Sequence, residues 1–259
     1  MILLAIETSS SRGSLALFVD GTLSREVCFP EGLLHGREIT ARLDDMLRAE
    51  GLRARSLGAI AVSVGPGSYT GLRVGVTAAK TLAFALGIPV VPESSLKVMA
   101  GNAAGGPPAF LLPILDGRRG HFFWGLFAMS AGEGSGLEDS IEGCIEGCIE
   151  GSVARLSPDK GTDAGEVLAA LELLAVPGEP APRVLTVGDG ADLLLQALSL
   201  PFLSRGPTSW DAPRASVLGR LAVDRAALAS FDREAVHRLE PAYLRVTEAE
   251  RKLATKGGV

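Results

Sequence analysis

Hydrophobic and polar positions in the first third of the chain follow a regular series of strand and helix patterns. Period-two alternation and continuous apolar runs predict strands, and apolar residues spaced three and four apart predict helices. The predicted elements are, in order, strands at 2–8, 14–20 and 22–29, a helix at 34–50, a strand at 57–64, a helix at 71–86 and a strand at 88–91. Asp20-Gly21 predicts a tight hairpin turn, and Gly51 and Gly87 predict the ends of the two helices.

The second half repeats this order of elements more faintly. The predicted elements are strands at 110–116 and 120–129, a helix at 163–175, a strand at 183–189, a helix from 191 and a helix at 213–230. Because the order strand–strand–helix–strand–helix occurs twice, the pattern indicates two related α/β lobes with a cleft between them.

The domain boundaries follow from this repetition. We predict a first lobe at 1–108, a second lobe at 109–230 with a low-complexity insert at 131–160, and a C-terminal tail at 231–259. The insert contains the unit I-E-G-C twice, ending at Cys144 and at Cys148. A period of four with glycine in every unit suits neither helix nor strand. We interpret it as a surface loop expanded by tandem duplication, the alternative being a metal or redox site at the two cysteines.

Composition narrows the class of protein. Of the 259 residues, 47% are hydrophobic and 21% are charged, as in globular proteins. No apolar run reaches the roughly 20 residues that span a bilayer, and the N-terminus has the pattern of a strand rather than of a signal peptide. We therefore expect a soluble, cytoplasmic protein that does not bind membranes. The net charge of −5 disfavours an autonomous nucleic-acid binder, and three histidines disfavour a histidine-rich metal site.

The segment AVSVGPGSYTGLRVG, residues 61–75, places a glycine-rich loop between a buried strand and a helix. The P-loop motif is not met, because Gly67 and Gly71 have the wrong spacing and Arg73 stands too late to be its lysine. The dinucleotide motif is not met either, because Thr70 occupies the position of its third glycine. Two interpretations remain: close packing of a small-residue helix face, which we favour, or anion binding at the helix N-terminus.

Two turns carry further candidate chemistry. Glu7-Thr8-Ser9 ends the first strand, where sugar kinases and actin-like ATPases place a metal-and-phosphate turn; the alternative is a turn whose hydroxyls satisfy backbone groups. Asp189-Gly190 is either a second phosphate turn or a helix N-cap, and we favour the cap. Cys28 is assigned to the core. The sequence contains no recognisable nucleophile–base set or H-x-x-x-H metal motif, so we identify no catalytic residue and no metal ligand.

Six stretches taken in order resemble one family. They are ILLAIETSSSRGSLAL (2–17), LLHGREITARLDDML (33–47), GPGSYTGLRVGVTAAKTLAFALGIPV (65–90), PILDGRRGHFF (113–123), VGDGA (187–191) and PAYLR (241–245). The chain resembles the TsaB (YeaZ) family, accessory proteins of bacterial tRNA threonylcarbamoyladenosine synthesis. The resemblance implies a two-lobed, actin-like α/β fold (ASKHA, ribonuclease H-like) with duplicated mixed sheets flanked by helices.

The resemblance also implies a role. The family pairs with TsaD, the paralogue that transfers the threonylcarbamoyl group to N6 of adenosine 37 in tRNAs reading ANN codons, with TsaE as a third, ATP-using component. The H-x-x-x-H metal site of TsaD corresponds here to the stretch from His35 to Ile39, which lacks the second histidine. The resemblance thus implies a noncatalytic chain that binds and activates TsaD. Such a chain requires no cofactor of its own, leaves ATP and a metal ion to the partner complex, and meets tRNA only through that complex.

The family's pairing surface is formed by the first-lobe helices, which correspond to residues 34–50 and 71–86. The implied interface residues are His35, Ile39, Leu43, Gly71, Leu72, Arg73, Gly75, Val76 and Ala79. When TsaD is absent, we expect a homodimer through the same surface.

The family usually has aspartate where Glu7 stands. We therefore assign Glu7, Thr8, Ser9, Asp189 and Gly190 to a vestigial nucleotide cleft. An alternative function is an ATP-dependent small-molecule kinase acting alone, with Glu7 and Asp189 lining its cleft. A peptidase is disfavoured, because the residues that its chemistry needs are missing.

Overall fold

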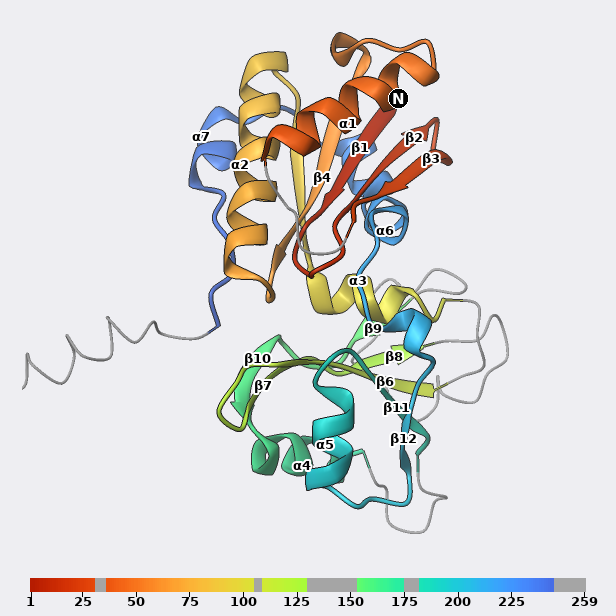
Figure 1. The fold of residues 1–259 in the computed structure, drawn as a ribbon, viewed down its shortest axis with the longest axis vertical. Helices are drawn as coiled ribbons and strands as arrows, with labels where there is room; N and C mark the ends of the chain where they lie inside the picture. Colours follow the sequence, from red (N-terminus) through yellow and green to blue (C-terminus); the bar gives the residue numbers. More distant parts are fainter. Residues whose placement is uncertain (31–35, 105–108, 130–152, 175–181, 245–259) are drawn as a thin grey trace, which may run out of the picture.

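A computed structural model of the protein describes residues 1–30, 36–104, 109–129, 153–174 and 182–244. These residues form two lobes, with one mixed sheet in each (Figure 1). Three positions discussed above lie outside the described residues: His35, Cys144 and Cys148.

The first lobe is built on a five-stranded sheet with the order β3-β2-β1-β4-β5. Its strands are β1 (Ile2–Glu7), β2 (Ser14–Val19), β3 (Thr22–Cys28), β4 (Ala59–Gly65) and β5 (Val90–Ser94). Strand β1 pairs antiparallel with β2 and parallel with β4. The helices of this part of the molecule are α1 (Gly36–Ala49), α2 (Tyr69–Leu86), α3 (Ser95–Gly101), α6 (Ala215–Leu228) and α7 (Arg233–Arg238), with a 3₁₀ turn at Ala54–Ser56.

The second lobe repeats the strand order of the first. Its elements are β6 (Ala109–Asp116), β7 (His121–Trp124), β8 (Phe127–Met129), β9 (Val153–Arg155), β10 (Lys160–Asp163), α4 (Ala164–Glu172), β11 (Val184–Val187), α5 (Ala191–Ala197) and β12 (Leu203–Arg205), with a 3₁₀ turn at Thr208–Trp210. The main path β10-β7-β6-β11-β12 has the same sequence of antiparallel and parallel pairings as β3-β2-β1-β4-β5. The duplication predicted from the order of elements is therefore present in the topology.

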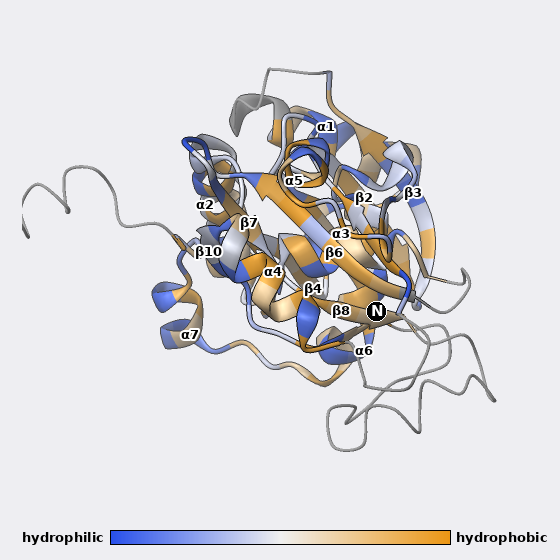
Figure 2. Cartoon of the chain, turned by 90° about the horizontal axis from the view of Figure 1, so that it is seen from below, coloured by the Kyte–Doolittle hydropathy of each residue, from blue (hydrophilic) through white to orange (hydrophobic). Residues whose placement is uncertain are grey.

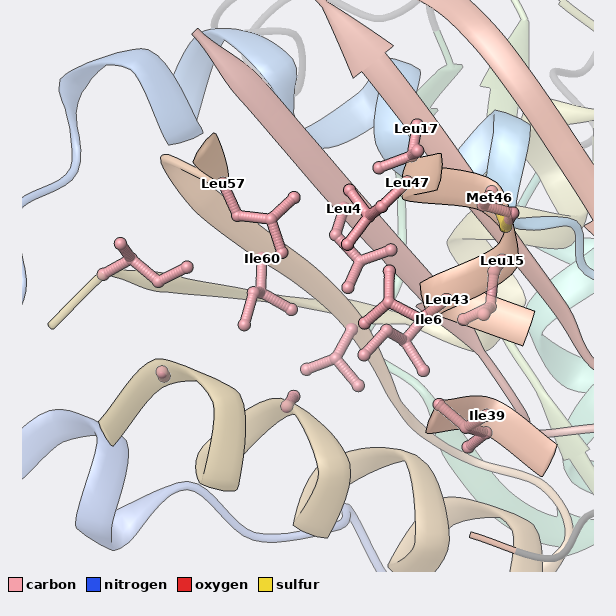
Figure 3. Packing of buried hydrophobic residues seen from close by; sticks show 14 of the residues in the cluster. Leu4, Ile6, Leu15, Leu17, Ile39, Leu43, Met46, Leu47, Leu57 and Ile60 are labelled. Atoms are coloured by element: carbon pink, nitrogen blue, oxygen red, sulfur yellow. The ribbon is translucent and has the colours of Figure 1, made fainter. Parts of the chain in front are cut away.

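The central strands are hydrophobic from Ile2 to Ile6 in β1 and from Ala59 to Val62 in β4, because both faces of their sheet are covered. On one face, Leu4, Ile6 and Ile60 pack against α1 and α2, as Figure 3 shows for Leu43 and Leu47 of α1. On the other face, Leu3 and Ala5 pack against α6. Alternate side chains of a strand point to opposite faces, so a strand covered twice loses its polar positions. Figure 2 shows the corresponding hydrophobic colouring along β6, the central strand of the second sheet.

Glycine ends several elements as the sequence predicts. Asp20 and Gly21 both have positive φ angles, 47° and 81°, which is the conformation that a two-residue hairpin turn requires. Gly87 adopts the left-handed conformation as the C-cap of α2, and its N–H donates to the carbonyl of Ala83.

Helix α6 differs from its predicted place. Residues 213–230 were assigned to the second lobe, but Ala215, Leu218 and Ala222 of α6 pack against the first sheet. The N–H of Ala215 also donates to Ser14 Oγ of β2 at 2.9 Å. An amphipathic pattern indicates that a helix has an apolar face, but it does not indicate which sheet that face will cover.

Two other expectations are corrected. The run at 120–129 forms two strands: β7 pairs with the Ile114–Asp116 end of β6, and β8 pairs with its Ala109–Leu111 end. Cys28 is exposed rather than in the core, because β3 is an edge strand whose outer positions face solvent.

Candidate functional site

A polar cleft of about 800 Å³ lies between the two lobes. Its first wall comes from the turn after β1 and from the glycine loop, and its second wall comes from the ends of β6 and β11 and from the segment before α6. The lining residues are Ser9, Ser10, Ser11, Arg12, Gly67, Ser68, Leu115, Asp116, Arg118, Phe123, Asp189, Thr208, Ser209, Asp211, Ala212 and Pro213. Of the five residues predicted for a nucleotide cleft, Ser9 and Asp189 are in this lining.

Glu7 lies behind the cleft wall and is fully buried. Its Oε1 accepts hydrogen bonds from the N–H and the Oγ of Ser9, both at 2.6 Å, and its Oε2 accepts one from Ser63 Oγ. Burial raises the pKa of the Glu7 carboxyl above its ordinary value near 4.5, and the hydrogen bonds from Ser63 and Ser9 oppose part of that rise. A carboxyl that is enclosed and engaged in this way cannot coordinate a metal ion in the cleft without leaving its three donors.

Thr8 and the glycine loop are in direct contact. Thr8 Oγ1 donates to the carbonyl of Gly71 at 2.8 Å, and the N–H of Ser68 donates to the carbonyl of Ser9 at 2.7 Å. A Cβ atom at Gly75 would lie 2.1 Å from Thr8 Oγ1, and one at Gly67 would lie 2.2 Å from the Ser9 carbonyl oxygen. The glycines therefore permit close packing of α2 against the turn after β1, which is the interpretation that we favoured.

The second turn, at Asp189-Gly190, has a related geometry. Gly190 is the N-cap residue of α5, and no side chain caps that helix. Asp189 Oδ1 instead accepts from the N–H of Asp116 at 2.9 Å. The predicted N-cap at Asp189-Gly190 is therefore confirmed in its position, at Gly190, but the Asp189 side chain does not cap the helix because it turns to the end of β6. Desolvation in the cleft, together with the charges of Asp116 and Asp211, raises the Asp189 pKa.

Within the described ranges, no three His, Cys, Asp or Glu side chains are grouped so that they could hold a metal ion. Both described histidines, His121 and His237, are exposed and lie in different lobes. Across the same residues, no helix combines the length and the hydrophobicity needed to cross a membrane.

An apolar groove of about 510 Å³ lies on the outer surface of the first lobe, between α1 and α2. It is lined by Ile39, Thr40 and Leu43 of α1 and by Arg73, Val74, Thr77, Ala78, Thr81 and Leu82 of α2. Three of the predicted interface residues, Ile39, Leu43 and Arg73, thus border the groove.

The other predicted interface residues of α2 lie on its inner side. Gly71, Leu72, Gly75, Val76 and Ala79 are all buried. They face the sheet and the turn after β1, where Gly75 leaves room for the Thr8 side chain and Val76 and Ala79 join the hydrophobic core. The outer stripe of the groove was not predicted, although its residues are spaced three and four apart along the helix and so indicate a second face. This stripe is formed by Val74, Thr77, Thr81 and Leu82.

Comparisons with known proteins find two related groups, named TsaD and TsaB. The family model described as "TsaD: tRNA N6-adenosine threonylcarbamoyltransferase" matches residues 33–146. The chain is 31% identical over 255 residues to the tRNA threonylcarbamoyladenosine biosynthesis protein TsaB of Bacillus subtilis, covering 97% of each protein. It is 35% identical over 127 residues to the protein of the same name in Escherichia coli, covering 48% of this chain and 54% of that protein.

A solved structure shares the fold. The structure of YeaZ from Pseudomonas aeruginosa superposes with a TM-score of 0.71 at 24% identity, over 94% of this chain and 99% of that one. The two lobes with matching sheets form the actin-like, ASKHA-type fold that the sequence predicted.

The contact between Gly75 and Thr8 can be tested by a double-mutant cycle. Gly75→Ala should lower the free energy of unfolding by about 1–2 kcal/mol, since overpacking outweighs the gain of about 1 kcal/mol in helix propensity. In a Thr8→Ala background, which removes the clashing oxygen, the same substitution should be neutral or stabilising. Denaturant unfolding of the four proteins measures this coupling, and an equal cost in both backgrounds would contradict the packing assignment.

The burial of Glu7 predicts a pH dependence of stability. Between its ordinary pKa and its raised folded value, the folded state binds more protons than the unfolded state, so the contribution of Glu7 to stability falls as pH rises. The stability of Glu7→Gln relative to wild type should therefore increase as the pH rises above about 4.5, by at most about 1.4 kcal/mol per pH unit, and level off once the pH passes the raised folded pKa. Thermal unfolding across this range measures it, with exposed Glu172→Gln as the control. A constant difference between Glu7→Gln and wild type would show that Glu7 does not retain its proton.

Proposed function

The chain belongs to the TsaB family of tRNA threonylcarbamoyladenosine biosynthesis proteins, and from this premise we propose that it is a noncatalytic partner that binds and activates TsaD. TsaD is the transferase expected to form the threonylcarbamoyl group on N6 of adenosine 37 in tRNAs reading ANN codons. The observation that carries the proposal is the apolar groove between α1 and α2, a surface suited to another helix pair.

The cleft supports the noncatalytic part of the proposal. The acidic residue at the end of β1, Glu7, is buried and held by Ser9 and Ser63. The glycine loop approaches the turn after β1 too closely to leave a phosphate-sized space between Gly67 and Ser9. The kinase-like alternative needs the carboxylate at the end of β1 to face a ligand, whereas Glu7 is buried behind the cleft wall, so the geometry favours a chain that activates an enzyme rather than one that acts alone.

The remaining parts of the proposal concern the assembly. The chain requires no cofactor of its own, and ATP and a metal ion act in the partner complex, where TsaE is the third component. The isolated chain forms a homodimer through the groove. Contact with tRNA is indirect, through the complex, and the assembly works in the cytoplasm.

Activation is testable with purified components. The chain alone should transfer no threonylcarbamoyl group to tRNA, and adding it to TsaD and TsaE should raise the rate of transfer. Calorimetric titration of the chain with TsaD from the same organism should give a Kd below about 1 μM. If the isolated chain bound Mg-ATP tightly and turned it over, and Glu7→Gln and Asp189→Asn abolished that turnover, the kinase-like function would replace this one.

The groove can be tested separately by placing a charge in it. Thr77 is exposed at the groove surface, so Thr77→Glu should weaken binding to TsaD by about tenfold or more, because an apolar contact would bury an unpaired carboxylate. Ala85→Glu is the matched control, since Ala85 is exposed on the same helix outside the groove. Equal affinities of the two variants would place the contact elsewhere.

A further inference from the structure

Arg73 is held in a fixed orientation on the outer surface of α2. Its guanidinium lies 4.1 Å from the centre of the Tyr69 ring, one helical turn earlier, and its Nε donates to the Tyr243 hydroxyl at 3.0 Å. The rings of Tyr69 and Tyr243 are themselves 5.2 Å apart. All three side chains are exposed to solvent, so this arrangement is a surface feature and contributes little to the core.

The position of Tyr243 depends on the chain after α7, which runs back along α2. Lys80 Nζ donates to the carbonyls of His237 and Leu239, at 2.7 and 2.9 Å. The N–H of Ala242 donates to the carbonyl of Val64 at 2.7 Å, near the C-terminal end of β4. These backbone contacts place Tyr243 beside Arg73 although 170 positions separate the two residues.

Arg73 also borders the apolar groove. Among the described residues that line the groove, Arg73 alone is charged, and none is acidic. Tyr243 accepts from the Nε atom of Arg73. Within the described part of the chain, the Nη1 and Nη2 atoms of Arg73 donate no hydrogen bond. A planar guanidinium with both terminal nitrogens available can bind a carboxylate in a bidentate manner, through two parallel hydrogen bonds.

We propose that Arg73, oriented by Tyr69 and Tyr243, binds a carboxylate of the protein partner that occupies the groove. The inference rests on the proposed function and adds the chemistry of the partner surface: an apolar helix face with an Asp or Glu beside the Arg73 end. The apolar lining selects a protein side chain over a nucleic-acid phosphate, since a polyanion requires a basic surface and the groove carries one positive charge. Orientation before binding reduces the entropy that Arg73 loses on pairing.

The test compares four variants by calorimetric titration with TsaD at about 0.1 M and about 0.5 M salt, since salt screens an exposed charge pair. Arg73→Gln should weaken binding by at least about tenfold at the lower salt concentration and flatten the salt dependence. Arg73→Lys should keep the salt dependence with an intermediate affinity, because it retains the charge without the planar fork. Tyr243→Phe should weaken binding by about twofold to tenfold, because an Arg73 side chain that is no longer held loses more conformational entropy on pairing.

Arg233→Gln is the matched control. Arg233 also lies over an aromatic ring, that of Phe84, at 5.8 Å, but it does not line the groove. It should leave both the affinity and its salt dependence unchanged. Thermal unfolding of each variant shows that the fold is retained.

Each outcome decides between the proposals. If the wild-type chain binds TsaD, and Arg73→Gln and Tyr243→Phe bind it with the same affinity and the same salt dependence, then the role of Arg73 is overturned. The proposed function is left standing in that case. Absence of wild-type binding would overturn both. If Arg73→Gln spared TsaD binding but weakened either self-association or tRNA binding of the isolated chain, the carboxylate of a TsaD helix would be the wrong ligand.

Discussion

The close approach of α2 to the turn after β1 determines how the first lobe is organised. Thr8 Oγ1 bonds to the carbonyl of Gly71, and Gly75 leaves room for the Thr8 side chain. This contact directs the inner face of α2 toward the sheet, so Leu72, Val76 and Ala79 are buried. It also leaves Val74, Thr77 and Leu82 to form the wall of the groove. One steric constraint thus determines both the core packing and the surface proposed for the partner.

The same constraint changes the character of the cleft. In the first lobe the glycine loop lies on the backbone of Ser9, and in the second lobe Gly188 and Gly190 lie on the backbone at the end of β6. The duplicated sheets therefore end in two turns that are closed by contacts within the protein. Glu7 lies beneath the first of them, where burial favours its neutral form. A cleft of this kind retains the outline of the actin-like fold without presenting a metal-binding carboxylate from β1.

The outer surface of the first lobe carries the features that the cleft lacks. The groove is apolar, and Arg73 at its border is oriented by aromatic rings from α2 and from the segment after α7. Lys80 ties that segment to α2 through the carbonyls of His237 and Leu239. Helix α7 and the residues that follow it as far as Leu244 are thus part of the first lobe's outer face, even though they follow the second lobe in the sequence.

The sequence by itself determined the strands of the first sheet with helices α1 and α2, the paired order of the two lobes and the family. These predictions rest on local signals: the periodicity, the hairpin residues Asp20-Gly21, the cap residue Gly87 and the glycine-loop stretch. Each signal can be recognised from neighbouring residues alone. Only the tertiary structure decided that α6 covers the first sheet, that Glu7 is buried, and that the small-residue face of α2 points inward. It alone brought Tyr243 to Arg73. The physical reason is that an apolar face specifies burial without specifying the surface that buries it, and contacts between residues distant in the chain have no characteristic spacing.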